Sequence, residues 1–163
     1  MRLKIVSLVA AAALLTACGT AQQDTAATGG SGQTSALGPV AGTQEDLVVN
    51  VGDRVFFDLD KYNLGSGAQK TLQAQAAWLK KFSGAKILVE GHADERGTRE
   101  YNLALGDRRA NSVKDYLIAL GVSANRVKII SYGKERPAAL GHNEAAWSQN
   151  RRGVTVLMGG AGS

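Results

Sequence analysis

The residues best placed to do chemistry lie in the sequence GHADERGT at 91–98 and in the helical pattern that follows it. Asp94 supplies an anion, and Arg109, about three turns into the next helical pattern, supplies a cation. A guanidinium can hold a carboxylate through two parallel hydrogen bonds, and a carboxylate can accept hydrogen bonds from an ammonium group. The pair therefore suits a ligand with an ammonium and a carboxylate on one carbon, which is the free end of an amino acid.

Simpler interpretations of these charges stay open. Asp94 and Arg109 could bond only to each other, as a structural salt bridge between a loop surface and a helix surface. Four neighbouring charged residues are predicted to form a solvated face: Glu95, Arg96, Arg99 and Arg108. Arg151 and Arg152, just before the last predicted strand, have the pattern of edge-strand charges that discourage aggregation.

A catalytic interpretation uses carboxylates of the same region. Four of them could supply an acid and a base, because a glycosidase needs two carboxylates at a defined separation: Asp58, Asp60, Asp94 and Glu95. His92, Asp94 and His142 could also form a metal site. No hydrolase motif surrounds either histidine, and the two are far apart in the sequence. We therefore expect a protein without enzyme activity, metal or cofactor.

Alternating strands and helices must position these residues. Short strands are predicted at 55–57, 87–89, 127–132 and 153–158. Apolar residues recur at helical spacing after the first strand (Leu72, Ala76, Leu79, Phe82) and after the second (Ala110, Val113, Leu117, Leu120). A short third helix is predicted around 143–149, and a loop at 93–97 joins the second strand to its helix. This alternation predicts helices packed on one sheet, a two-layer α/β sandwich.

The N-terminus has the pattern of a bacterial lipoprotein signal. Arg2 and Lys4 precede an almost unbroken apolar run at 5–15, and the string Leu-Thr-Ala-Cys ends at Cys18, the single cysteine. The run is too short to span a bilayer, which takes about 20 apolar residues. We expect 1–17 to be removed and Cys18 to be lipidated. An ordinary secretory signal that leaves Cys18 as an incidental thiol is the alternative.

Composition and length indicate how the mature chain is organised and which functions it lacks support for. Residues 18–45 are predicted to be a flexible tether, because Gly, Ser, Thr, Ala and Gln dominate there and cannot bury enough apolar surface to offset the entropy of ordering. Residues 46–160 have the length of one domain. Without the leader, 17 basic residues face 14 acidic ones, and so small an excess does not support nucleic-acid binding. One cysteine committed to lipid excludes a disulfide.

Several motifs together resemble a known family. They are GHADERGT (91–98), EYN (100–102), LG (105–106), RRANSV (108–113), SYGKE (131–135), Pro137 and NRR (150–152). This set resembles the OmpA-like domain family, and its lipid-anchored, peptidoglycan-associated branch in the Tol–Pal system also shares VFFD at 55–58 and LGH at 140–142. The resemblance covers about 46–158. It implies an α/β (α+β) two-layer sandwich, with two main helices and a short third on a four-stranded mixed sheet.

The resemblance also implies a ligand. In the family, the domain holds meso-diaminopimelate of the peptidoglycan stem peptide non-covalently, and Asp94 and Arg109 match the partners of its ammonium and carboxylate. Other matched positions line or close the same pocket: Phe57, Asp58, Thr98 and Leu105. Ala93 stands where a threonine or similar polar residue is common, and Gly153 replaces a small or branched residue of the last strand. Neither departure alters the two charges.

The same resemblance implies a place in the cell and partners. Acylated Cys18 anchors such a protein in outer-membrane lipid, and Gly19 in place of aspartate favours the outer over the inner membrane. The domain then faces the periplasm. TolB and TolA are the partners that the resemblance implies, together with a role in outer-membrane integrity and in its invagination during cell division.

Overall fold

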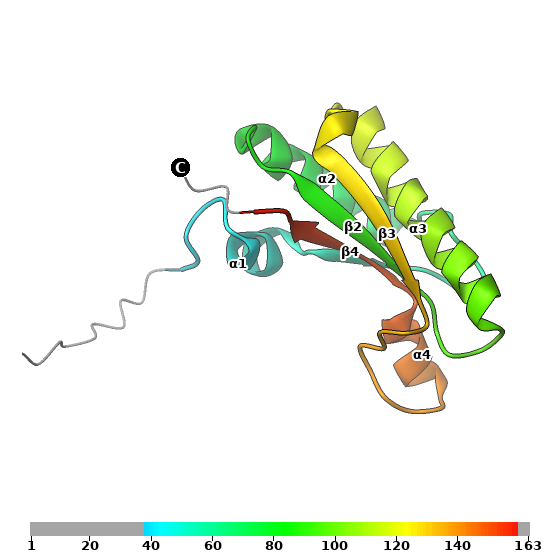
Figure 1. Cartoon of the computed structure of the whole chain (residues 1–163). Coiled ribbons are helices and arrows are strands. Elements are labelled where there is room, and N and C mark those ends of the chain that lie inside the picture. The colour runs from blue at the N-terminus through cyan, green and yellow to red at the C-terminus, as the bar shows by residue number, and fades with distance from the viewer. Residues whose placement is uncertain (1–37, 160–163) are drawn as a thin grey trace, which may run out of the picture. The chain divides into compact units, whose positions relative to one another are not determined.

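The computed structural model describes residues 38–159 (Figure 1). Its elements, in chain order, are α1 (Gln44–Asp46), a π-helical turn (Leu47–Val51), β1 (Arg54–Phe56), α2 (Ser66–Lys81), β2 (Ile87–His92), α3 (Arg99–Ala119), a 3₁₀ turn (Ala124–Arg126), β3 (Val127–Gly133), α4 (Glu144–Asn150) and β4 (Arg152–Leu157). The predicted leader, Cys18 and most of the predicted tether lie outside the described residues.

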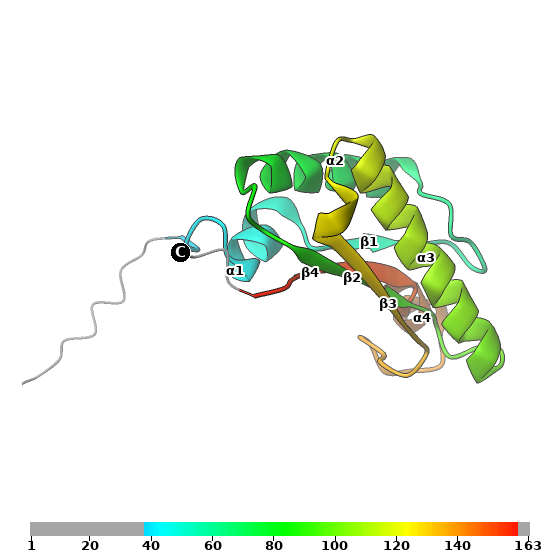
Figure 2. The same cartoon turned by 45° about the horizontal axis from the view of Figure 1, so that its top comes forward.

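The four strands form one mixed sheet in the order β1-β4-β2-β3. β2 and β3 are parallel, with Ile87 opposite Val127, and α3 is the crossover between them. β4 runs antiparallel to both β1 and β2. α2 and α3 lie on one side of this sheet, which makes the second layer (Figure 2). The predicted two-layer α/β sandwich is therefore confirmed.

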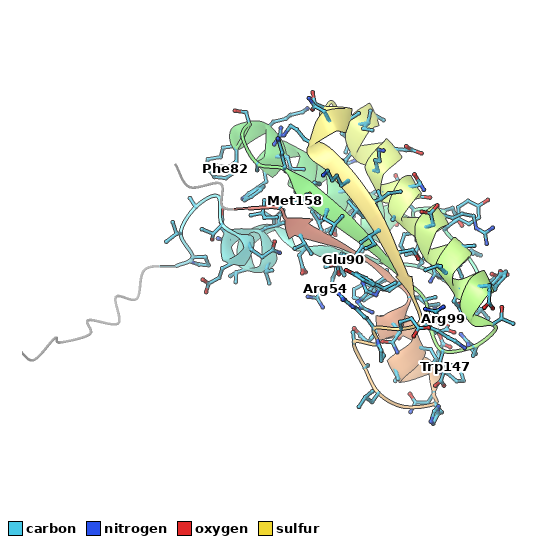
Figure 3. The ribbon with its side chains drawn as sticks, viewed as in Figure 1. Arg54, Phe82, Glu90, Arg99, Trp147 and Met158 are labelled. Carbon is cyan, nitrogen blue, oxygen red and sulfur yellow. The ribbon has the colours of Figure 1, made fainter. Side chains whose placement is uncertain are left out.

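The core lies between the sheet and these two helices. The predicted apolar stripes supply most of it, and the following side chains are at most 3% exposed: Leu72, Ala76 and Leu79 of α2, Ile87 and Val89 of β2, and Ala110, Val113 and Leu117 of α3. Burial of each large side chain stabilises the fold by about 1.5–3 kcal/mol. On the other face of the sheet, Arg54 and Glu90 project away from the helices (Figure 3).

The helical segment at Gln44–Val51 was not predicted from the sequence. Thr43 caps its first turn, since its hydroxyl accepts a hydrogen bond from the Asp46 amide (3.2 Å). Asp46 also accepts a hydrogen bond from the Trp78 indole (2.8 Å), and Leu47 is fully buried. This segment depends on contacts with α2, which lies far along the chain, and local periodicity does not reveal such contacts.

The edge-strand interpretation of Arg151 and Arg152 is wrong. β4 lies inside the sheet, between β1 and β2, and the edges are β1 and β3. Both arginine side chains are buried and bonded to neighbouring groups. Both arginines therefore form hydrogen bonds inside the protein, at the end of the sheet where β2 finishes and β4 begins, beside α4 (Figure 1).

A contact between two glycines sets the distance of α3 from the sheet. A Cβ atom on Gly91 would lie 1.8 Å from the Gly106 carbonyl oxygen, and a Cβ on Gly106 would lie 2.3 Å from the Ser131 hydroxyl. Only glycine allows this approach of helix to strand. Because Arg109 follows Gly106 by one turn of α3, the contact brings the Arg109 side chain to the end of β2.

Candidate functional site

A pocket of about 370 Å³ lies at the end of β2, where the loop 93–97 leads into α3. The loop after β1, the loop 93–97 and the first turns of α3 supply its walls. The lining residues are Leu59, Asp60, Asp94, Arg96, Gly97, Tyr101, Asn102, Leu105 and Arg109. Its size is within the range of small-molecule sites, about 300–1,000 Å³. The two charged residues predicted to bind a ligand thus share one pocket.

Local hydrogen bonds hold the loop 93–97. Thr98 is the N-cap of α3, and its hydroxyl accepts a hydrogen bond from the Tyr101 amide (3.2 Å). Gly97 has a φ of +88°, which favours glycine. The buried Asn102 side chain donates to the Arg96 carbonyl (2.8 Å) and to the Thr98 carbonyl (3.1 Å). The backbone under the pocket is therefore fixed at both ends of the turn.

Asp94 is a buried carboxylate that two arginines surround. It is 5% exposed. Its Oδ1 accepts hydrogen bonds from the Arg96 amide and from Nε of the same residue, both at 3.1 Å. Its Oδ2 accepts from Arg96 Nη2 (2.6 Å) and Arg151 Nη1 (3.3 Å). Burial by itself would raise the pKa of Asp94, but these hydrogen bonds outweigh it and keep the pKa below its ordinary value of 3.8.

Arg109 is fully buried, and backbone carbonyls hold its guanidinium. Nε donates to the Lys61 carbonyl (2.8 Å), Nη1 to the His92 carbonyl (2.8 Å) and Nη2 to the Asp58 carbonyl (3.1 Å). The ring of Phe57 lies 5.2 Å from Cζ. Burial lowers the pKa of Arg109 to about 10, and the charge of Asp94 opposes this shift. The side chain stays cationic at neutral pH, with two of its five N–H groups outside these three bonds.

Two expectations about this pair are wrong. Among the described residues, no hydrogen bond or salt bridge joins Asp94 to Arg109, so the structural salt bridge does not form. Neither residue lies on a surface, since both side chains are buried. The reason is that each charge has other partners: Asp94 has arginines, and Arg109 has two carbonyls from the loop after β1 and one from the end of β2. Each charge is thus held separately at the pocket.

Arg96 belongs to the pocket and not to a solvated face. Its side chain is one-third exposed and pairs with Asp94, and its Cζ lies 4.1 Å from the centroid of the Trp147 ring. Glu144 lies 3.9 Å from its Nη2. Figure 3 shows Trp147 of α4 and Arg99, the first residue of α3, at the same end of the sheet. Arg96 therefore connects the pocket with α4.

Sequence reasoning also missed Arg151 and Glu144. Arg151 is 5% exposed and donates to Asp94, to the Phe57 carbonyl (3.0 Å) and to Glu144 (2.5 Å). The signal that could have found them is the spacing on α4. Glu144 and Trp147 lie three residues apart on one face of α4, and Arg151, four residues after Trp147, is the C-cap residue of that helix.

The four remaining predicted positions differ in what they contact. Leu105 lines the pocket and is 5% exposed. Phe57 and Asp58 line a neighbouring hollow of about 290 Å³ together with Arg151. Phe57 contacts Arg109 through its ring, and Asp58 contacts it through its backbone carbonyl. The Asp58 carboxylate is exposed and faces Lys61 (3.4 Å). Thr98 acts as the helix cap described above.

The groups of the proposed metal site, His92, Asp94 and His142, do not come together. Nδ1 of His142 lies 2.7 Å from the Glu95 carboxylate, which also accepts a hydrogen bond from the Trp147 indole. His92 is buried beside Glu90, and burial, aided by Arg152 and Arg136, lowers its pKa to about 4. Within residues 38–159, no three His, Cys, Asp or Glu side chains are grouped to hold a metal ion. In the same range, no helix has the length and apolarity to cross a membrane.

Comparison with known proteins identifies the family. Residues 56–151 match the OmpA family. The chain is 60% identical over 122 residues to a peptidoglycan-associated lipoprotein of Rhizobium meliloti strain 1021, which covers 75% of this chain and 69% of that protein. The chain belongs to the peptidoglycan-associated lipoproteins of the OmpA family. A peptidoglycan-associated lipoprotein of Pasteurella multocida is 44% identical over 151 residues, 93% of this chain and 95% of that one.

A solved peptidoglycan-associated lipoprotein supports the same conclusion in three dimensions. The crystal structure from Burkholderia pseudomallei is 47% identical, with a TM-score of 0.63 over 65% of this chain and 90% of that chain. The family resemblance stated from the motifs is thus confirmed, and so is its OmpA-like fold. Peptidoglycan-associated lipoproteins are structural proteins, and the catalytic interpretation is set aside on this ground.

Proposed function

We propose that the chain is an outer-membrane lipoprotein that binds peptidoglycan non-covalently, through the meso-diaminopimelate of its stem peptide. The observation that carries the proposal is the pair of buried opposite charges, Asp94 and Arg109, that line one pocket and have separate partners. The names of its relatives point to the same polymer.

The chemistry of the pocket fits the free end of diaminopimelate. That end carries an ammonium and a carboxylate on one carbon. The two remaining N–H groups of Arg109 are the donors for the carboxylate, and Asp94 is the acceptor for the ammonium. Leu59 and Leu105 supply apolar walls for the methylene chain. Uncharged sugars and nucleic-acid phosphates lack this combination of charges.

The anchor completes the proposed function. Acylated Cys18 holds the N-terminus in the outer membrane, because several acyl chains give stable attachment where a single one is marginal. The segment 18–45 is the tether, and the domain at 46–160 binds the wall from the periplasmic side. Many copies in a thin compartment raise the effective concentration, so weak individual contacts add up to firm attachment that still exchanges. TolB and TolA are the proposed partners in outer-membrane integrity and in its invagination at division.

Co-sedimentation with purified peptidoglycan tests wall binding. The full chain, extracted in detergent, is expected to pellet with the wall, and the variant Asp94→Asn is expected to stay in the supernatant. Arg99→Gln is the matched control, because Arg99 is an exposed arginine of the same region that pairs with Glu135. Pelleting of Asp94→Asn to the wild-type extent would refute the pocket assignment.

Membrane fractionation tests the anchor separately. Cys18→Ser is expected to accumulate as an unlipidated precursor that takes up no radiolabelled palmitate. Its wall binding in the co-sedimentation assay should remain, since the substitution lies outside the domain. Normal processing and normal outer-membrane fractionation of Cys18→Ser would contradict the lipoprotein signal.

A further inference from the structure

We infer that the Arg96 side chain competes with the ligand's ammonium group for the Asp94 carboxylate, so that ligand binding displaces Arg96 from Asp94 toward Glu144. The inference rests on the proposed function and adds a residue that sets how strongly the pocket binds. It gives a role to an arginine that the separate ligand roles of Asp94 and Arg109 leave unexplained.

The acceptor capacity of Asp94 carries the argument. A carboxylate offers about four lone-pair positions, and Asp94 already accepts four hydrogen bonds. Two of them come from the Arg96 side chain, one from the Arg96 amide and one from Arg151. An ammonium group can therefore be accepted only if a donor leaves.

Arg96 is the donor best able to leave. The Arg151 side chain is 7% exposed and has further bonds to the Phe57 carbonyl and to Glu144. The Arg96 side chain is 34% exposed and lines the pocket. Its backbone stays in place when the side chain moves, because Asn102 holds the Arg96 carbonyl. Departure of the side chain frees one position on each carboxylate oxygen and leaves the amide and Arg151 bonds intact.

The groups that would hold the displaced guanidinium already lie beside it. Its Cζ lies 4.1 Å from the centroid of the Trp147 ring, within cation–π range. Glu144 lies 3.9 Å away, too far for a hydrogen bond but close enough to attract the guanidinium. Arg96 can therefore keep its aromatic contact and exchange one carboxylate for another. The ammonium replaces the guanidinium at Asp94, so the charge around the carboxylate is unchanged.

The test measures affinity for free meso-diaminopimelate by calorimetry, on the full chain in detergent. Arg96→Ala removes the competitor and is expected to bind about tenfold more tightly than wild type, which corresponds to about 1.4 kcal/mol. Arg99→Ala is the control and should leave the affinity unchanged. Equal or weaker binding by Arg96→Ala, with normal wild-type binding, would overturn the competition and leave the proposed function standing. Absence of binding by every chain, wild type included, would overturn both.

Tryptophan emission gives a second measurement, and its main result comes from the wild-type chain. The chain has two tryptophans: Trp147 contacts Arg96, whereas Trp78 is buried and bonded to Asp46. Movement of the guanidinium over the Trp147 ring should change the emission of the wild-type chain as diaminopimelate saturates it. The change should be absent from Arg96→Ala. Saturation of the wild type without any change in emission would refute the displacement of Arg96.

Discussion

The buried guanidinium of Arg151 lies 3.3 Å from the buried carboxylate of Asp94. Arg151 comes from the junction of α4 and β4, and Asp94 from the loop after β2, so this contact joins two segments that are distant in the sequence. Arg151 also lines the neighbouring hollow beside Phe57. It therefore supports Asp94 from outside the ligand pocket and fixes the position of the anion.

Removal of Arg151 should weaken the fold as well as wall binding. Removing one partner of a buried ion pair costs about 3–5 kcal/mol. The loss of unfolding free energy in Arg151→Met should lie near the low end of this range, because Asp94 keeps its bonds to Arg96. Urea unfolding at pH 7 measures the loss. Arg99→Met is the control, since the exposed pair of Arg99 with Glu135 should be worth less than about 1 kcal/mol. Equal stability of the two variants would contradict a structural role for Arg151.

Arg109 should also stabilise the fold, in contrast to the expectation that its side chain lies on a helix surface. Arg109→Gln leaves three backbone carbonyls, those of Lys61, His92 and Asp58, without their donor. An unsatisfied buried group costs about 1–3 kcal/mol, and the His92 carbonyl is the buried one of the three, so the unfolding free energy should fall by about 1–3 kcal/mol. Circular dichroism during urea unfolding checks this. A variant as stable as wild type would show that the carbonyls find other donors.

The contact of α3 with β2 predicts a severe effect of one methyl group. Gly91→Ala would place Cβ 1.8 Å from the Gly106 carbonyl oxygen, so α3 would have to move. Loss of about 3 kcal/mol or failure to fold is expected, because the helix carries Arg109 and much of the core. Gly67→Ala in α2 is the matched control. Nothing lies within 4 Å of a Cβ at Gly67, and this change should stabilise the helix by about 0.5–1 kcal/mol.

The sequence predicted the elements whose apolar residues follow a local pattern, and it missed the parts that depend on contacts between distant segments. Apolar residues at helical spacing located α2 and α3, because these helices bury one continuous stripe each. β2 was predicted to end at residue 89, but it continues to His92. Its last residues are not apolar, and pairing with neighbouring strands extends β2 through them: Glu90 and Gly91 pair with both β3 and β4, and His92 pairs with β3.

The site was predicted less completely than the fold. The motif located Asp94 and Arg109, and both line the pocket. The environment of each charge was not predictable, because the partners of Arg109 come from the loop after β1 and those of Asp94 include Arg151. Spacing along the chain shows which residues share a helix face but not which loops close over them. The burial of both charges is therefore a result of the tertiary structure.

Wall binding should withstand mild acid. The pKa of Asp94 lies below its ordinary value of 3.8, because the hydrogen bonds from Arg96 and Arg151 outweigh burial. The carboxylate thus stays ionised at pH 4.5, and its contribution to binding and to stability is lost only as the pH falls through the lowered pKa. Co-sedimentation between pH 7 and 3 measures this. Loss of binding centred at or above pH 5 would exclude Asp94 as the titrating group.

As the pH is lowered, the unfolding free energy should begin to fall before Asp94 becomes protonated. The group responsible is His92. Burial holds the pKa of His92 at about 4, against an ordinary value of 6.5, and its neighbours include Glu90, Arg136 and Arg152. Between these two values the unfolded chain binds a proton that the folded chain does not, so the unfolding free energy decreases as the pH is lowered from 6.5 to 4. The loss should reach about 3 kcal/mol, at 1.36 kcal/mol per pH unit.

Urea unfolding of wild type and His92→Gln across this range measures it. The variant should lose this dependence, and an identical slope for both chains would show that another group titrates.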